Sequence, residues 1–297
     1  MSTLERALQK ASALGRAANT ANSARPDRSV VAPNSQAKTE TQETESGRSI
    51  EIRPDMLRAG GSFAASDMEH RIAEELRLIK RPLLINAEGQ GGVSTNPNLL
   101  MIASALPGAG KTFLSLNLAV SMASELDWTV LVIDGDVTRP TLSRTLGLAD
   151  APGLVNLLEQ ERGDLNEFVY KTNFPGLRVL PAGPSRPNVK ELLGSQRMRS
   201  LVADLTAQER RIVLFDSPPL LLTSEARVLA SYVGQIVLVV EAGVTPRRSV
   251  LDAIETLDSA KAINLVLNKS RQPLGIGDYH YSAYGPHARE HEQKTEG

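Results

Sequence analysis

Hydrophobic residues in the middle of the chain alternate between short continuous runs and helical repeats. Continuous apolar runs are typical of strands buried on both faces of a sheet, and they occur at 99–104, 129–134, 177–181, 211–216, 235–241 and 263–268. Helical spacing or helix-start residues mark the intervening segments at 111–125, 140–146, 153–160, 189–193, 197–206, 225–231 and 247–260. This alternation predicts an α/β fold with a doubly wound, mostly parallel sheet.

The two ends of the chain show a different pattern. Residues 1–18 have the apolar spacing of a short amphipathic helix, which is either a fraying helix or a docking segment for another protein. Residues 19–49 are polar with almost no large apolar side chains, which predicts a disordered linker. The folded domain is expected over 50–271, and the polar residues 272–297 are expected to form a flexible tail.

The first part of the domain precedes the long strands. Residues 50–57 predict a short extended segment, and a helix is expected from about Ser66 to Lys80, ended by Pro82. Glu74, Arg77 and Lys80 lie three residues apart on a charged face of this helix. On spacing alone, this face is solvated and holds weak ion pairs. Residues 87–98 are rich in Gly and Asn and predict a loop.

The segment 103–112, Ala-Ser-Ala-Leu-Pro-Gly-Ala-Gly-Lys-Thr, joins the first long strand to its helix. This layout is typical of a loop that binds the phosphates of ATP, although Ala105 stands where the usual motif begins with Gly. The glycines let the backbone N–H groups point at phosphate, Lys111 is expected to reach the β- and γ-phosphates, and Thr112 is expected to ligate Mg²⁺. The alternative is a glycine turn without a ligand. The residues expected to bind the nucleotide here are Pro107, Gly108, Ala109, Gly110, Lys111, Thr112 and Phe113.

Acidic residues follow two of the predicted strands. Asp134 and Asp136 stand in Val-Ile-Asp-Gly-Asp, and Asp216 stands in Val-Leu-Phe-Asp-Ser-Pro-Pro. An isolated Asp at a strand end is usually a turn residue or a helix cap. In parallel strands, however, these carboxylates converge on the edge that carries the phosphate loop, where they would hold Mg²⁺ or accept a proton.

Two further polar features lie near the end of the chain. Asn268 ends the last predicted strand and is expected on the same edge, farther from the loop, where a purine would lie; the alternative is a turn residue. Tyr279, Tyr281 and Tyr284 cluster in the tail, although a disordered tail has no need of aromatics; the alternative is a chance cluster. The nearby histidines have no spacing that fits a compact metal site.

Composition limits the possible partners. The chain has 297 residues, a net charge of −1 and no cysteine, so neither bulk attraction to nucleic acid nor a disulfide is indicated. No apolar run approaches the length of a membrane span, and the N-terminus lacks a signal-peptide core. A cytoplasmic protein is therefore expected, which reaches the membrane only through a partner.

Taken together, these motifs resemble the bacterial tyrosine autokinases of exopolysaccharide synthesis, in the MinD/ParA-like P-loop superfamily, and more closely their exosortase-associated subtype. Ala-Leu-Pro-Gly-Ala-Gly-Lys-Thr is similar to the family's Walker A, Val-Leu-Val-Ile-Asp-Gly-Asp to its Walker A′, and Val-Leu-Phe-Asp-Ser-Pro-Pro to its Walker B. Glu74, Arg77 and Lys80 resemble the helix motif through which members assemble into rings, with Lys in place of the final Arg.

The resemblance implies ATP- and Mg²⁺-dependent transfer of phosphate to the tail tyrosines, in trans between subunits. It assigns Lys111 and Thr112 to the phosphates and the metal, Asp136 and Asp216 to the metal shell, and Asp134 to the base. It also implies that a membrane chain-length-determinant protein, a polysaccharide co-polymerase, activates the kinase.

The main alternative is a MinD/ParA-type switch ATPase that modifies no tyrosine. Such proteins usually carry a second Lys early in the loop, where this chain has Leu106. A nucleotide-binding adaptor without catalysis would need a broken site, and none is visible in the motifs.

Overall fold

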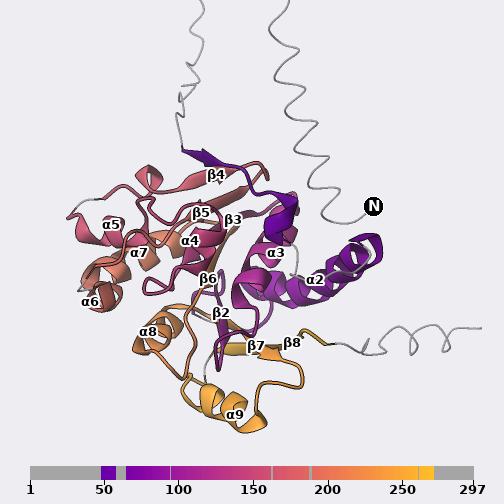
Figure 1. Cartoon of the computed structure of the whole chain (residues 1–297). Helices are drawn as coiled ribbons and strands as arrows, with labels where there is room; N and C mark the ends of the chain where they lie inside the picture. Colours follow the sequence, from indigo (N-terminus) through magenta and orange to yellow (C-terminus); the bar gives the residue numbers. More distant parts are fainter. Residues whose placement is uncertain are drawn as a thin grey trace, which may run out of the picture.

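The computed structural model describes residues 48–57 and 65–270, except 94, 162, 187, 188 and 260, and for 65–71 it describes the backbone alone. The predicted N-terminal helix, nearly all of the predicted linker, and Tyr279, Tyr281 and Tyr284 lie outside the described residues. In the described part, helices cover both faces of an eight-stranded sheet (Figure 1). The predicted α/β fold with a mostly parallel sheet is confirmed.

The strands follow the apolar runs closely. Their order across the sheet is β1-β4-β5-β3-β6-β2-β7-β8, and only β4 and β5 pair antiparallel. Neither β1 nor β4 was expected as a separate strand, because two or three residues carry too little periodicity to be recognised. The strands are β1 (Ser49–Ile50), β2 (Leu99–Ser104), β3 (Thr129–Asp134), β4 (Tyr170–Thr172), β5 (Leu177–Leu180), β6 (Arg211–Asp216), β7 (Gln235–Glu241) and β8 (Ala262–Asn268).

The helices form a layer on each face of the sheet (Figure 1). Helices α2, α3 and α4 pack on the face that presents Val130 and Val132, and α5 to α9 pack on the face that presents Leu131 and Ile133. The helices are α2 (Ala65–Ala87), α3 (Lys111–Ala123), α4 (Thr141–Thr145), α5 (Leu154–Glu159), α6 (Val189–Leu193), α7 (Gln196–Thr206), α8 (Ser224–Tyr232) and α9 (Arg247–Glu255), with 3-10 turns η1 (Pro54–Leu57) and η2 (Leu165–Glu167).

Helix α2 corrects one prediction, because it does not end at Pro82 but continues to Ala87. A proline inside a helix removes one hydrogen bond and costs about 3 kcal/mol. Packing offsets this cost, since Leu76 and the fully buried Leu83 anchor the helix in the core on either side of the proline. The segment 50–57 also differs from the extended form expected, because η1 follows β1 there.

The charged residues of α2 do not share one face as expected. Lys80 is only 7% exposed, and its Nζ donates to the Ser121 carbonyl at 2.9 Å and pairs with Glu125 at 2.6 Å. Glu74 and Arg77 form an ion pair, with 67% and 36% of their side chains exposed. Lys80 therefore fastens α2 to α3, and the accessible charged surface consists of Glu74 and Arg77.

Among the helices described, none is both long and apolar enough to cross a membrane.

Candidate functional site

The order of the strands brings the predicted site residues to one edge of the sheet. β6 lies between β2 and β3, and Asp216 at its end is the register partner of Ile102 in β2 and of Asp134 in β3. Because these strands are parallel, their carboxyl ends and the loop after β2 meet at the same edge, where ligands of such sheets bind.

The loop between β2 and α3 depends on glycine. Gly108 and Gly110 have φ angles of 86° and 96°, a region that residues with a Cβ rarely adopt. A Cβ on Gly110 would also lie 2.2 Å from the Asn268 amide nitrogen. Helix α3 begins directly after Gly110, and no side chain caps it. Its first N–H groups and its dipole are therefore available for an anion such as phosphate.

Lys111 extends along this loop. Its Nζ donates to Ser104 Oγ at 3.1 Å, and Ser104 in turn donates to the Leu106 carbonyl at 2.6 Å. Burial lowers the pKa of Lys111, whereas the negative charges of Asp216 and Asp136 act in the opposite direction. The ammonium group is thus held between the loop and the acids, as a phosphate-binding lysine requires.

Asp216 is held by hydroxyl groups. It is almost fully buried and accepts hydrogen bonds from Thr112 Oγ1 at 2.7 Å and Ser115 Oγ at 3.0 Å. Burial raises its pKa from 3.8 to about 6, although both hydroxyls favour the charged form. The carboxylate and the Thr112 hydroxyl therefore present oxygen atoms to one point beside the loop.

Asp134 is more deeply enclosed. It has no exposed surface, and it accepts hydrogen bonds from the backbone N–H of Ser143 at 2.8 Å, from Ser143 Oγ at 2.7 Å and from the N–H of Asp136 at 3.2 Å. Burial raises its pKa from 3.8 to about 7, and the charge of Asp216 adds to the rise. A carboxylate with a pKa near neutrality is suited to proton transfer.

Asp136 lies nearer the solvent. Its Oδ1 accepts a hydrogen bond from the N–H of Arg139 at 2.9 Å. Burial raises its pKa, and the contact with Arg139 and the charge of Lys111 oppose the rise.

The acidic residues fit a hydrated divalent cation bound with a nucleotide. Asp134 and Asp216 are both buried and repel each other, so a cation beside them would be stabilised. Within the described residues there is no group of three or more metal-ligating side chains that would form a closed metal cage. Mg²⁺ is usually held by one or two carboxylates together with phosphate oxygens and water, and Thr112, Asp136 and Asp216 supply oxygen atoms of this kind.

Asn268 lies elsewhere than expected. Instead of standing away from the loop, it donates from Nδ2 to the Ala109 carbonyl at 2.8 Å. The next residue, Lys269, donates to the Gly108 carbonyl at 2.8 Å and pairs with Glu241 at 3.0 Å. The reason is topological, because β8 is only one strand removed from β2 and its end reaches the loop backbone.

Sequence reasoning missed four side chains that hold the site together. They hydrogen-bond to site residues or to the loop, and they are Ser104, Ser115, Ser143 and Lys269. Ser115 had a detectable signal, since it lies one helical turn after Lys111. Ser143 had none, because only the fold brings α4 to the end of β3.

The loop, the uncapped helix and the buried acids at the carboxyl edge of a parallel sheet define a P-loop nucleotide-binding domain. The family model described as the CobQ/CobB/MinD/ParA nucleotide binding domain matches residues 100–276. The chain therefore has the nucleotide-binding fold and loop of this family.

Similarity to individual proteins indicates which kind of nucleotide-binding protein this chain is. The tyrosine-protein kinase YwqD of Bacillus subtilis is 31% identical over 201 residues, which cover 65% of this chain and 84% of that protein. The crystal structure of the VpsO kinase domain is 31% identical, covers 70% of this chain and 100% of its own, and superposes with a TM-score of 0.58. The kinase domain of Escherichia coli ETK is 26% identical, with coverages of 75% and 87% and a TM-score of 0.58. The chain belongs to the bacterial tyrosine kinases of this nucleotide-binding superfamily.

Proposed function

We propose that this chain is an ATP-dependent protein-tyrosine autokinase that phosphorylates Tyr279, Tyr281 and Tyr284 in its C-terminal tail. The observation that carries the proposal is the meeting of the phosphate loop with Asp134 and Asp216 at one sheet edge, in a chain whose relatives are tyrosine-protein kinases. A tyrosine kinase needs a phosphate clamp, a metal site and a proton acceptor within one small volume.

Each site residue has a role in this proposal. Lys111 and the N–H groups at the start of α3 hold the β- and γ-phosphates. Thr112, Asp136 and Asp216 hold Mg²⁺ directly or through water. When bound, the ion would neutralise negative charge on the phosphates. Asn268 contacts the Ala109 carbonyl of the loop in the structure, and we propose that it also contacts the base of the nucleotide.

Asp134 is the proposed acceptor of the tyrosine proton. Its raised pKa suits that role, and within the described residues Oδ1 accepts only the N–H of Asp136 at 3.2 Å, whereas Ser143 holds Oδ2. Because Asp134 has no exposed surface, we propose that substrate binding shifts the segment 135–143 so that Oδ1 faces the tyrosine. Asp136 is less buried and is proposed to hold the metal, so variants of Asp134 and Asp136 distinguish a base from a metal ligand.

The wider setting of the activity follows from the resemblance to the family. We propose that transfer occurs in trans within a ring of subunits, and that a membrane chain-length-determinant protein recruits the chain from the cytoplasm to the inner face of the membrane and activates it. Phosphorylation would then regulate exopolysaccharide polymerisation or export in an exosortase-associated system.

The ring proposal predicts different effects for the exposed pair Glu74 and Arg77 and for the buried Lys80 of α2. Replacing Glu74 and Arg77 together with Ala should lower the assembled mass in light scattering and leave thermal stability nearly unchanged, because exposed ion pairs contribute about 0–1 kcal/mol. Replacing Lys80 with Ala should instead lower the melting temperature, because it removes a buried contact between α2 and α3. An assembly that keeps its mass in the double variant would contradict the interface.

The proposed activity is tested by incubating the purified chain with ATP and Mg²⁺ and mapping phosphotyrosine by mass spectrometry. Phosphate on one or more of the three tail tyrosines is the expected result. Hydrolysis of ATP without any phosphotyrosine would overturn the proposal and favour a switch ATPase.

A further inference from the structure

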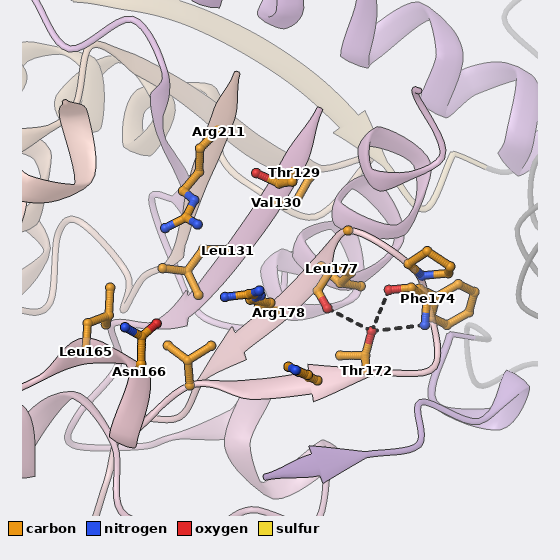
Figure 2. A pocket seen from close by; sticks show the side chains of 14 residues that line it. Thr129, Val130, Leu131, Leu165, Asn166, Thr172, Phe174, Leu177, Arg178 and Arg211 are labelled. Carbon is orange, nitrogen blue, oxygen red and sulfur yellow. Dashed lines mark hydrogen bonds between the residues drawn. The ribbon is translucent and has the colours of Figure 1, made fainter. Parts of the chain in front are cut away.

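A second pocket lies at the opposite edge of the sheet from the phosphate loop. Its volume is about 430 Å³, and its lining includes the first residues of three strands, Thr129 of β3, Leu177 of β5 and Arg211 of β6 (Figure 2). Thr129 and Asp134 are the two ends of β3, so at about 3.3 Å per residue the Thr129 end of the pocket lies about 17 Å from Asp134. It is separate from the nucleotide site.

Two arginines extend into this pocket from neighbouring positions on one face of the sheet. Arg178 is the register partner of Leu131, and Arg211 is the register partner of Thr129, so β3 lies between the two arginines. Figure 2 shows both guanidinium groups directed toward the Leu131 side chain. Within the described residues, neither arginine has an ion-pair partner, and the lining contains no acidic residue.

The positive charges of this pocket are close enough to act on each other. Burial lowers the pKa of Arg211, and the charge of Arg178 lowers it further. Lys171, the register partner of Arg178 in β4, adds a third basic residue to the lining. A cavity lined by several basic side chains and no acidic one is suited to a ligand with more than one negative charge.

The remaining lining restricts the kind of anion. Leu131, Leu165 and Val169 supply apolar surface on the same face of the sheet, and the half-buried Leu165 is the most accessible of them. A bare phosphate ion would leave this surface exposed to water, whereas an aromatic ring bearing a phosphate would cover it and place the phosphate among the guanidinium groups. Phosphotyrosine has both parts and carries a charge of about −1.5 to −2.

The chain itself contains a suitable source of this group. Between Gln272 and Pro286, the only Asp, Glu, Lys or Arg is Asp278, so the segment around the three tail tyrosines has no cation that the pocket would repel. We propose that the pocket lined by Arg178 and Arg211 binds a phosphotyrosine of the C-terminal tail of a second copy of the chain. The proposed kinase function supplies the phosphate on the tail, so the proposal rests on it in that respect. Recognition of phosphotyrosine by the pocket does not depend on it.

Binding in the pocket gives the modified tail a site away from the acidic edge where it was phosphorylated. The phosphate would be repelled by Asp134, Asp136 and Asp216 and attracted by the arginines. The pocket would therefore hold the phosphorylated tail away from the nucleotide site.

The test is direct binding of a fluorescent synthetic peptide of residues 276–286 carrying three phosphotyrosines. The protein is the full chain with Tyr279, Tyr281 and Tyr284 replaced by Phe, saturated with Mg²⁺–ADP, and fluorescence anisotropy is measured. The double variant Arg178→Gln and Arg211→Gln should bind the peptide at least about tenfold more weakly, because charge-assisted hydrogen bonds are lost. Arg210→Gln is the matched control, since it removes one charge from the same edge at an exposed ion pair, and it should change affinity less than twofold.

Several outcomes decide the proposal. The proposal would be overturned if the double variant bound the phosphorylated peptide as tightly as the protein with both arginines does. It would also be overturned if the unphosphorylated peptide bound as tightly as the phosphorylated one. Full displacement of the peptide by millimolar inorganic phosphate would show that the pocket takes a bare anion, and would also overturn it. If the double variant does not fold by circular dichroism, Arg178→Lys and Arg211→Lys retain the charge and lose the planar fork, and each should weaken binding. Because the peptide is synthetic, a chain that binds it but transfers no phosphate would refute the kinase proposal and leave this one standing.

Discussion

The two edges of the sheet carry opposite charge and are built in different ways. At the carboxyl edge, Asp134 and Asp216 are buried, and protein hydroxyl or N–H groups hold each of them in place. At the amino edge, Arg178 and Arg211 are only partly buried, and apolar side chains separate them. The acidic groups are therefore preorganised for one geometry, as phosphoryl transfer requires, whereas the basic groups can adapt to a ligand.

This difference indicates a division of roles along the strands. Preorganised groups at low dielectric contribute most to a reaction, because they need not rearrange as charge develops. Long, partly exposed side chains suit binding, since they can fit ligands of variable position. If the roles are separate, variants at the carboxyl edge should change catalysis, and variants at the amino edge should change binding of the tail.

The largest effect is expected from Lys111→Met. Its ammonium donates to Ser104 Oγ in the structure and is proposed to contact the phosphates, so its removal should lower phosphotyrosine formation about 10³-fold or more and leave the fold intact. Label incorporation and circular dichroism measure the two quantities. The Arg178→Gln and Arg211→Gln double variant is the control from the other edge, and its initial rate should stay within twofold. A folded Lys111→Met protein with near-normal transfer would remove the basis for the site.

The next effect is expected from Asp134→Asn. A general base contributes about 10² to 10⁴ in rate, so single-turnover transfer should slow within that range while binding of Mg²⁺–ATP persists. Stopped-flow binding with a fluorescent nucleotide and rapid-quench transfer separate the two quantities. Asp136→Asn should instead weaken nucleotide binding in the presence of Mg²⁺. If Asp134→Asn loses affinity and keeps its chemistry, Asp134 is a metal-shell residue.

A smaller effect concerns stability without nucleotide or metal. The folded chain raises the pKa of Asp134 from 3.8 to about 7, so between pH 4 and 7 the folded state binds more protons than the unfolded state. The contribution of Asp134 to the free energy of unfolding should therefore fall as the pH rises through this range, by at most about 4 kcal/mol at about 1.4 kcal/mol per pKa unit. Asp216, whose pKa is raised from 3.8 to about 6, adds a fall of the same sign. Urea titrations in a chelating buffer measure it. Asp134→Asn should reduce this slope, and an equal slope in that variant would show that the burial of Asp134 is not its cause.

The sequence was sufficient to predict the six longer strands and the convergence of Asp134, Asp216 and the loop on one edge of the sheet. Continuous apolar runs indicate buried strands, and they occur at 99–104, 129–134 and 211–216. Because these strands are parallel, their carboxyl ends lie together. The contact of Asn268 with the loop could not be predicted from the sequence, because it depends on the position of β8 beside β7, which the sequence pattern does not indicate.

Other failures came from local rules that packing overrode. Pro82 predicts a helix end, but the buried Leu83 carries α2 past it. Lys80 has the spacing of a surface residue, but the approach of α3 gives its ammonium a carbonyl and a carboxylate. The basic pocket had no sequence signal, because Arg178 and Arg211 are far apart in the chain and only the pairing of β5 and β6 with β3 brings them together.

The central claim is that the carboxyl edge of one copy phosphorylates the tail of another. The most direct test mixes two proteins with labelled ATP and Mg²⁺, one with Lys111→Met and an intact tail, the other active with Tyr279, Tyr281 and Tyr284 replaced by Phe. Activity of the second protein is verified separately on a tail peptide. We predict that label appears on the tail tyrosines of the Lys111→Met protein. A tail that stays unlabelled beside a demonstrably active partner would contradict the account.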